Sequence, residues 1–259
     1  MSEKNDFEVV ALRAFKDNYI WTLRNDRYAA VVDPGDAQPV LDYLQRERLE
    51  LCAVLATHHH PDHVGGIAAL LARGAVPVYG PRGEPIPTLT HPVGEGDEVR
   101  IAELGLRFDV LDIPGHTRAH IAYYGANSLF CGDTLFACGC GRLFEGTAPQ
   151  MVDSLAKLAA LPDETLVYSG HEYTMANIGF ALEVEPDNEE LKARAVSDAQ
   201  KRKNERPTLP STVGREKQTN PFLRCLQPAV IASANKYLGA RASGPVQVFA
   251  AIRQWKNDY

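Results

Sequence analysis

A histidine-rich turn between two apolar segments constrains this chain more than any other feature. Residues 57–66 read THHHPDHVGG and hold four of the eight histidines of the chain. The apolar run LCAVLA at 51–56 predicts a buried strand before the turn, and GGIAALLA at 65–72 predicts the start of a helix after it. The internal position excludes a terminal tag. A solvated turn needs only Gly, Asn, Asp or Pro, so this composition favours side chains that converge on a cation.

Polar residues also follow other predicted strands. The front part of the chain alternates short β-branched runs, such as YAAVVDPGD at 28–36, with helical patterns, such as PVLDYLQRERL at 39–49. Three further strands are predicted in 107–117, 128–134 and 165–172, and the polar residues just past them are His116, Asp133 and His171. A single histidine after a glycine is more often an ordinary turn residue. Four such turns together favour one shared cleft at a sheet edge, where α/β proteins commonly place their sites.

The spacing of these residues suits metal binding. His58 and His60 are two positions apart, so their side chains emerge on the same side of an extended chain, whereas Asp62 and His63 lie beyond the bend. With the three strand-end residues, the candidates comprise five imidazoles and two carboxylates. A catalytic site with an open position takes three protein ligands, so this inventory suits two metal ions ~3.5–4 Å apart, bridged by a carboxylate. Zinc is the first choice for these ligands, and iron or manganese is also compatible.

The charge of the chain is unevenly distributed. Residues 1–175 hold 14 Lys/Arg and 24 Asp/Glu, whereas residues 176–259 hold 13 Lys/Arg and 9 Asp/Glu, which gives net charges of −10 and +4. A solvated acidic surface is the commoner interpretation. A cation-binding domain joined to a tail that attracts an anion is the alternative. A charge of +4 over that length is too weak to indicate a nucleic-acid partner.

Other features bear on the cellular compartment. The N-terminus MSEKNDFEVVALRAF lacks the apolar core of a signal peptide, and no apolar stretch approaches the ~18 residues of a membrane span. The five cysteines are odd in number and form no CxxC pair. These features predict a reduced, cytoplasmic chain without a membrane partner, and we expect a monomer.

The order of the motifs resembles the metallo-β-lactamase superfamily and, within it, the glyoxalase II (hydroxyacylglutathione hydrolase) family. Besides the histidine turn, the matching segments are FKDNYIWTL (15–23), VVDPGD (31–36), IPGHT (113–117), FCGDTLF (130–136), GCGRLFEGT (139–147), SGHEYT (169–174), RPTLPST (206–212) and TNPFLR (219–224). The resemblance covers almost the whole chain. It implies an α+β fold, namely an αββα sandwich of two mixed sheets with helices outside, followed by a C-terminal α-helical domain. We therefore predict a catalytic domain at 1–175 and a glutathione-binding helical domain at 176–259.

The resemblance also implies which residues bind the metals. It gives three ligands to each metal and one bridge: His58, His60 and His116 at the first, Asp62, His63 and His171 at the second, and Asp133 between them. Asp33 resembles the superfamily's supporting aspartate, which forms hydrogen bonds behind the metal turn. His59, His91 and His120 match no ligand.

The implied reaction is hydrolysis of S-(2-hydroxyacyl)glutathione, typically S-D-lactoylglutathione, to D-lactate and glutathione in methylglyoxal detoxification. Two cations would lower the pKa of water toward ~7 and polarise the thioester carbonyl. Thiolate is a good leaving group, so no strong general acid is required. The catalytic candidates are Asp133 and Asp62, the latter to orient the water proton. The alternative is a glutathione persulfide dioxygenase with a mononuclear iron site, which resembles this chain without the full C-terminal helical domain.

Two predicted helices follow residue 175. The segment 186–204 begins with Asp187 and has Glu190 three residues later, which predicts an N-terminal cap. The segment 243–259 has Pro245 in its first turn and an apolar stripe, with Arg253 and Lys256 on an adjacent face where both can reach one anion. The residues alone favour a solvated helix end, whereas the resemblance implies that this pair holds the glycine carboxylate of glutathione.

Further substrate contacts are implied in two motifs. Arg142 and Tyr173 match the family's substrate-binding positions. Phe144 stands where a tyrosine is often found, so a hydroxyl contact is absent there. Cys138 and Cys140 lie on the loop after the predicted bridging aspartate, and we interpret both as loop thiols rather than metal ligands.

Overall fold

The computed structural model describes residues 7–259, which form two compact units. The first unit comprises residues 7–112 and 119–132, and the second comprises Ile113–Arg118 and Asp133–Tyr259. The chain thus passes between the units at residues 112, 118 and 132, and the predicted division at residue 175 stays a prediction.

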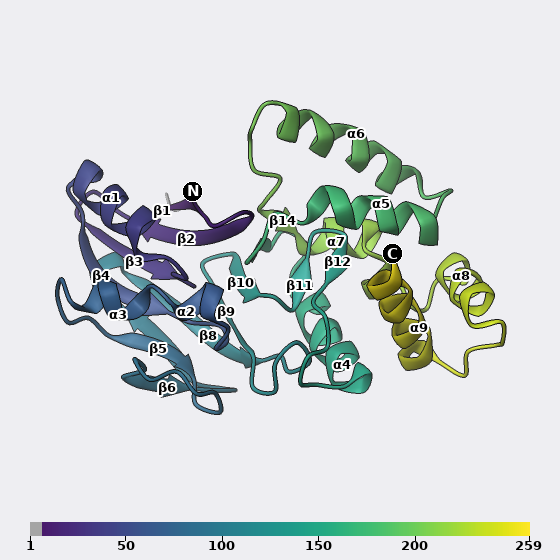
Figure 1. Cartoon of the computed structure of the whole chain (residues 1–259), viewed down its shortest axis with the longest axis horizontal. Helices are drawn as coiled ribbons and strands as arrows, with labels where there is room; N and C mark the ends of the chain where they lie inside the picture. Colours follow the sequence, from purple (N-terminus) through teal and green to yellow (C-terminus); the bar gives the residue numbers. More distant parts are fainter. Residues whose placement is uncertain (1–6) are drawn as a thin grey trace. The chain divides into compact units, whose positions relative to one another are not determined.

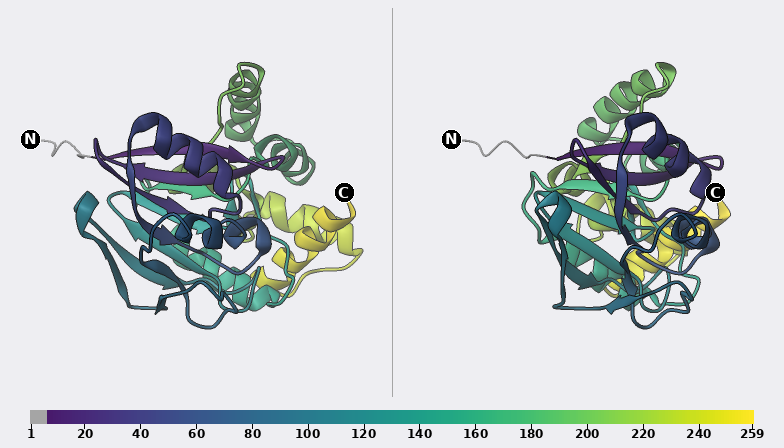
Figure 2. Two further views of the ribbon diagram at one scale, coloured as in Figure 1. Left: turned by 60° about the vertical axis from the view of Figure 1, so that its left-hand side comes forward. Right: turned by 90° about the vertical axis from the view of Figure 1, so that its left-hand side faces the viewer.

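A mixed sheet with helices on one face forms the first part of the first unit (Figures 1 and 2). Strands β1 to β3 pair antiparallel and β3 to β6 pair parallel. The strands are β1 (Glu8–Ala14), β2 (Asn18–Arg24), β3 (Tyr28–Val32), β4 (Glu50–Leu55), β5 (Val78–Pro81) and β6 (His91–Val93), and the helices are α1 (Ala37–Glu47), α2 (Pro61–Val64) and α3 (Ile67–Leu71). Apolar residues of α1 and α3 pack with Val31 and Val54 of the central strands in one core cluster, which explains the long apolar runs of β3 and β4.

Four antiparallel strands form a second layer of the first unit. They are β7 (Glu98–Ile101), β8 (Leu106–Asp112), β9 (Ile121–Gly125) and β10 (Ser128–Gly132), with the short 3₁₀ helix η1 (Ala102–Leu104) between the first two. In β8 the residues Leu106, Phe108 and Val110 are buried and alternate with exposed ones, as expected when one sheet face is covered. The Tyr123 hydroxyl of β9 donates to the Ala56 carbonyl just after β4 at 2.9 Å, which ties the two layers together.

The second unit is mostly helical (Figure 1). Its elements are β11 (Leu135–Phe136), β12 (Gly139–Cys140), α4 (Ala148–Ala159), β13 (Leu166–Ser169), α5 (Thr174–Val184), α6 (Glu189–Lys203), β14 (Ser211–Thr212), α7 (Val213–Thr219), η2 (Pro221–Leu223), α8 (Pro228–Leu238) and α9 (Pro245–Asp258). Helix α4 begins with a capping box in which the Thr147 and Gln150 side chains satisfy each other's backbone N–H groups. Among residues 7–259, no helix is long and apolar enough to cross a membrane.

The two predicted C-terminal helices are present, but the cap of α6 differs from the prediction. Asn188, not Asp187, is the N-cap, and its side chain accepts from the Leu191 N–H at 3.1 Å. Asp187 lies in the preceding turn, whereas Asn188 has the extended backbone that an N-cap requires. In α9, Pro245 occupies the first turn as predicted, and the apolar stripe packs through Trp255 and Tyr259 against Phe180, with ring centroids 5.4 and 5.6 Å apart.

Candidate active site

The histidine turn of the first unit brings imidazole and carboxylate atoms together. His58 Nε2 lies 3.1 Å from His60 Nδ1, and His63 Nε2 lies 3.5 Å from Asp62 Oδ2. Nitrogen ligands bound tetrahedrally to zinc at about 2.0–2.1 Å are separated by about 3.3 Å. These spacings therefore fit metal ligands. The sequence did not predict α2, a single helical turn with Pro61 at its start, which carries Asp62 and His63.

Asp33 holds this turn from behind. Its Oδ1 accepts from the Thr57 N–H at 2.7 Å, and its Oδ2 accepts from the Thr57 hydroxyl at 2.7 Å and lies 3.1 Å from His63 Nδ1. Asp33 and His63 are 3% and 1% exposed, so this pair is shielded from water. Because Nδ1 of His63 faces Asp33, Nε2 is the atom left to bind a metal. Asp33 thus occupies the supporting position that the family resemblance implies.

A close approach of two backbone segments explains the glycine of the VVDPGD motif. A Cβ atom at Gly35 would lie 1.8 Å from the Asp62 carbonyl oxygen, which no side chain could accommodate without moving backbone. Glycine at this position therefore allows the segment after β3 to pack against the histidine turn.

Two polar residues that the sequence did not single out also hold the turn. Asn18 of β2 donates from Nδ2 to Asp62 Oδ2 at 3.0 Å and to the Asp62 carbonyl at 3.2 Å. Buried Glu84 accepts from the His59 N–H at 2.6 Å and lies 2.9 Å from His59 Nδ1. His59 therefore contacts Glu84, while His60 and Asp62 form the contacts described above. Asn18 belongs to the FKDNYIWTL motif, which was the only signal that could have identified it.

The second unit places three further candidate ligands together. His171 Nε2 and His116 Nε2 lie 3.3 and 3.6 Å from Asp133 Oδ2. All three residues are buried. The His116 Nδ1 lies 2.9 Å from the Arg142 carbonyl, so this nitrogen is the N–H donor and Nε2 keeps its lone pair for a metal. The donor atoms and their spacing fit a divalent cation such as zinc.

A pocket of about 530 Å³ in the second unit contains two of these ligands. All five predicted substrate residues line it. The lining residues are His116, Asp133, Phe136, Cys140, Gly141, Arg142, Phe144, Tyr173, Ala176, Asn177, Arg253 and Lys256. Three cationic side chains face one carboxylate in this lining, which favours an anionic ligand.

Arg253 forms hydrogen bonds within the protein that its position near a helix end did not indicate. Its Nη1 donates to the Cys140 carbonyl at 2.7 Å, and its Nη2 donates to Asn257 Oδ1 at 3.1 Å. The side chain is buried, and among the described residues its Nε has no hydrogen-bond partner. Lys256 donates to Asn177 Oδ1 at 2.5 Å. Arg253 is thus partly a structural residue.

Burial changes the acid–base properties of Lys256 and of the two loop cysteines. It lowers the pKa of Lys256 to about 8, and the nearby Arg253 charge contributes in the same direction. It raises the pKa of Cys138 to about 12 and also raises that of Cys140. Within residues 7–259 all five cysteines are buried free thiols. The two loop cysteines are therefore protonated at neutral pH, which disfavours metal ligation.

Comparisons with known proteins identify the family. Residues 15–171 match the metallo-beta-lactamase superfamily, and residues 172–259 match the family described as hydroxyacylglutathione hydrolase C-terminus. The hydroxyacylglutathione hydrolase of Nitrosomonas eutropha is 58% identical over 252 residues, which cover 97% of this chain and 99% of the relative. The chain belongs to the hydroxyacylglutathione hydrolase family. A hydroxyacylglutathione hydrolase from Vibrio cholerae is 52% identical over 254 residues, with the same coverage of both chains.

Solved structures confirm the predicted fold class. ETHE1 from Myxococcus xanthus is similar with a TM-score of 0.65 and 28% identity, covering 96% of this chain and 97% of that chain. TTHA1623 in a di-iron-bound form has a TM-score of 0.59 and 27% identity, covering 83% of this chain and 100% of that chain. The fold is α+β, of the metallo-β-lactamase type, followed by the helical C-terminal region of hydroxyacylglutathione hydrolases.

Both family segments contribute candidate residues, and two of the substrate candidates, Arg142 and Phe144, lie in the metallo-β-lactamase segment. All seven candidate metal ligands lie within the metallo-β-lactamase segment. Tyr173, Arg253 and Lys256 lie within the hydroxyacylglutathione hydrolase C-terminus. A general metal-dependent hydrolase core is thus combined with a segment particular to hydroxyacylglutathione hydrolases.

Proposed function

We propose that this chain hydrolyses S-(2-hydroxyacyl)glutathione, typically S-D-lactoylglutathione, to D-lactate and glutathione, and that it does so as a cytoplasmic monomer in methylglyoxal detoxification. The observation that carries the proposal is the cationic pocket whose lining includes His116 and Asp133. A thioester whose distant carboxylate lies near Lys256 would extend toward these candidate ligands. The curated relatives named hydroxyacylglutathione hydrolase support the same substrate.

We also propose that seven side chains hold two metal ions, with zinc first and iron or manganese as alternatives. The groups are His58, His60 and His116, then Asp62, His63 and His171, with Asp133 as the bridge. The fit rests on the donor spacings within each unit and on the orientation of His63 and His116, whose Nδ1 atoms already have partners. The similar structure in a di-iron-bound form supports a dinuclear site. When bound, such ions supply Lewis acidity and lower the pKa of water toward ~7.

The remaining chemistry depends on the side chains of the chain. Asn18 fixes the Asp62 carboxylate, which is the group proposed to orient the water proton. Arg142, Arg253 and Lys256 hold the glutathione portion, so that the thioester carbon stays near the candidate ligands. The leaving thiolate needs no strong acid. Tyr173 stacks on His171 at 4.6 Å between ring centroids and closes that side of the pocket.

Thioester cleavage should proceed equally well without oxygen. Water is the nucleophile in the proposed reaction, so anaerobic and aerobic assays with S-D-lactoylglutathione should give the same rate and equal amounts of D-lactate and thiol. The control is glutathione persulfide under both atmospheres. Oxygen-dependent formation of sulfite from this control, with no thioester cleavage, would establish the dioxygenase alternative.

Substrate binding should weaken as the pH rises through about 8, where Lys256 loses its proton. The charged ammonium attracts a carboxylate below this pH, and the neutral amine does not above it. Arg253, Arg142 and the two loop thiols face Lys256. The inhibition constant of S-methylglutathione, measured from about pH 6.5 to 9.5, should rise in that window by about tenfold. Lys256→Arg should keep tight binding at the higher pH, because a guanidinium stays charged. A flat profile in the unaltered protein would contradict a ligand-binding Lys256 with a pKa near 8.

A further inference from the structure

The hairpin of β11 and β12 forms part of the pocket wall, although it has little regular structure. Each strand has two residues, paired as Leu135 with Cys140 and Phe136 with Gly139. A short two-stranded hairpin is at best marginally stable alone. Its turn residue Cys138 has a φ of 55°, which disfavours a residue with a Cβ atom. Contacts from elsewhere must therefore keep Phe136 and Cys140 at the pocket.

Buried side chains supply these contacts along five consecutive residues of the hairpin. Asn220 Nδ2 donates to the Phe136 carbonyl at 3.0 Å and to the Gly139 carbonyl at 2.9 Å. The Cys138 N–H donates to Glu216 Oε2 at 2.8 Å. The carbonyls of Ala137 and Cys140 accept from Asn177 and Arg253 at 3.0 and 2.7 Å. The hairpin is thus held by side chains in addition to its own short ladder.

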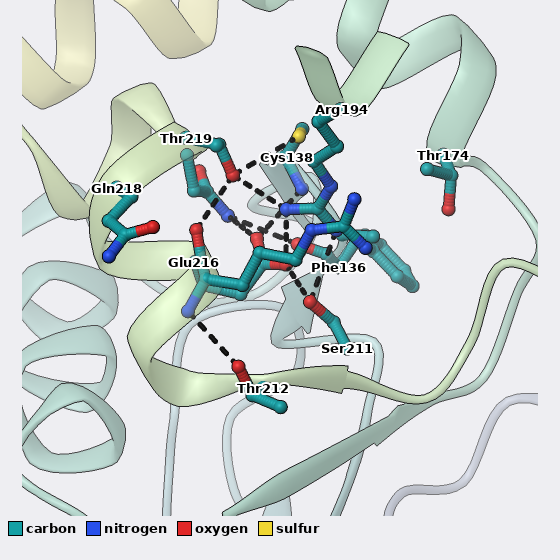
Figure 3. Close-up of polar contacts among 12 residues, drawn as sticks. Phe136, Cys138, Thr174, Arg194, Ser211, Thr212, Glu216, Gln218 and Thr219 are labelled. Carbon is teal, nitrogen blue, oxygen red and sulfur yellow. Dashed lines mark hydrogen bonds and ion pairs between the residues drawn. The ribbon is translucent and has the colours of Figure 1, made fainter. Parts of the chain in front are cut away.

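Glu216 and Asn220 are themselves fixed by a buried polar network. Figure 3 labels Glu216, Arg194, Ser211 and Thr219 of this network. Glu216 pairs with Arg194 Nη1 at 2.7 Å, accepts from Asn220 Nδ2 at 3.1 Å and also accepts from the Ser211 hydroxyl. Arg194 donates further to the Thr219 hydroxyl at 2.6 Å. Because these groups are fully or almost fully buried, each depends on the others for its partners.

This network gives a role to two motifs that hold none of the candidate ligands or substrate contacts. Ser211 belongs to RPTLPST (206–212), and Asn220 belongs to TNPFLR (219–224). We propose that Asn220, with Glu216, is a positioning residue for the substrate pocket. It holds the hairpin in the register that presents Phe136 and Cys140 to the substrate. Only the expected change in KM rests on the proposed function. The hairpin contacts themselves do not depend on a substrate.

The variant Asn220→Ser tests the inference. Serine still accepts from the Phe222 N–H as a cap of η2, but it is too short to reach the two hairpin carbonyls. We expect the amide of Cys138 to exchange hydrogen faster, and KM for S-D-lactoylglutathione to rise about tenfold with kcat and metal content kept. The matched control is Thr212→Ala, which removes the cap of α7 in the same segment and touches no hairpin atom. It should lower Tm without changing KM or Cys138 exchange.

Each outcome decides between distinct hypotheses. Unchanged Cys138 exchange in Asn220→Ser would overturn the positioning role even if the enzyme is active. An equal rise of KM in Thr212→Ala would show that stability alone is responsible, which also overturns it. Faster exchange in a protein that cleaves no glutathione thioester would support the positioning role and reject the proposed function. If Asn220→Ser does not fold, Glu216→Gln keeps an acceptor for the Cys138 N–H, and the same measurements apply with a smaller expected rise in KM.

Discussion

The variant Asp133→Ala is expected to lose at least about 1000-fold in kcat/KM, more than the ~10–100-fold typical of an outer-shell partner. The reason is its position, because its Oδ2 lies within 3.6 Å of both His116 Nε2 and His171 Nε2. Removing this carboxylate takes away a negative group that lies close to two imidazoles of the second unit. Metal analysis of the unaltered protein should give about two ions per chain, and the variant should hold fewer.

The control for this variant is another carboxylate of the same unit. Asp163 is exposed and pairs with Lys217 at 2.7 Å, an ion pair whose contribution to the free energy of unfolding is about 0–1 kcal/mol. Asp163→Ala should keep both the metal content and the rate of thioester hydrolysis. Full metal occupancy and full turnover in Asp133→Ala would remove the basis of the dinuclear proposal.

The candidate ligands were predictable because their signals are local. His116, Asp133 and His171 each follow a strand within a few residues, and the structure ends β8, β10 and β13 at Asp112, Gly132 and Ser169. The spacing of His58 and His60 likewise predicted side chains on one side of the chain, and their ring nitrogens lie 3.1 Å apart. Local periodicity was sufficient at these positions, because the backbone conformation decides where such side chains point.

The supporting residues were not predictable for the opposite reason. Asn18 contacts Asp62 from 44 positions away, Glu84 contacts His59 from 25, and Asn220 contacts Phe136 from 84. A single asparagine or glutamate has no periodic signal, and its role follows only from the tertiary fold. Membership of a motif identified Asn18 and Asn220 as candidates for some role, but it did not indicate which backbone groups they hold.

The α9 helix illustrates a related limit. Helical periodicity placed Arg253 and Lys256 together on one face beside the apolar stripe, and both line the pocket. Periodicity gives the face of a helix but not the depth of burial, so the bond from Arg253 to the Cys140 carbonyl was missed. The resemblance implies one role for Arg253 and Lys256, but the structure leads us to expect unequal effects of replacing them.

Arg253→Ala should lose about 100-fold in kcat/KM, whereas Lys256→Ala should lose about tenfold, mostly in KM. The arginine variant leaves the buried Cys140 carbonyl without its donor, at a cost of about 1–3 kcal/mol, and also removes a cation from the pocket. The lysine variant removes a cation that is already partly discharged near pH 8, and its Asn177 partner keeps its other bond to the Ala137 carbonyl. The control is Gln254→Ala, on the exposed face of α9, which should change neither kcat/KM nor KM.

Two substrates separate the roles of the two residues. With S-D-lactoylglutathione and a short thioester that lacks the glycine carboxylate, Lys256→Ala should lose activity only on the first. Arg253→Ala should lose activity on both, because the hairpin that it supports also forms the wall near Phe136, and the loss should be larger on the glutathione thioester. Metal content and Tm are measured alongside, because a fall in either would explain a loss of activity without any role in substrate binding. Equal losses of Lys256→Ala on both substrates would mean that this lysine only supports the fold. If both variants keep the preference of the unaltered protein for glutathione thioesters, the glycine carboxylate is bound elsewhere in the pocket. Arg142 is then the next residue to replace, because it is the third positive side chain in the lining.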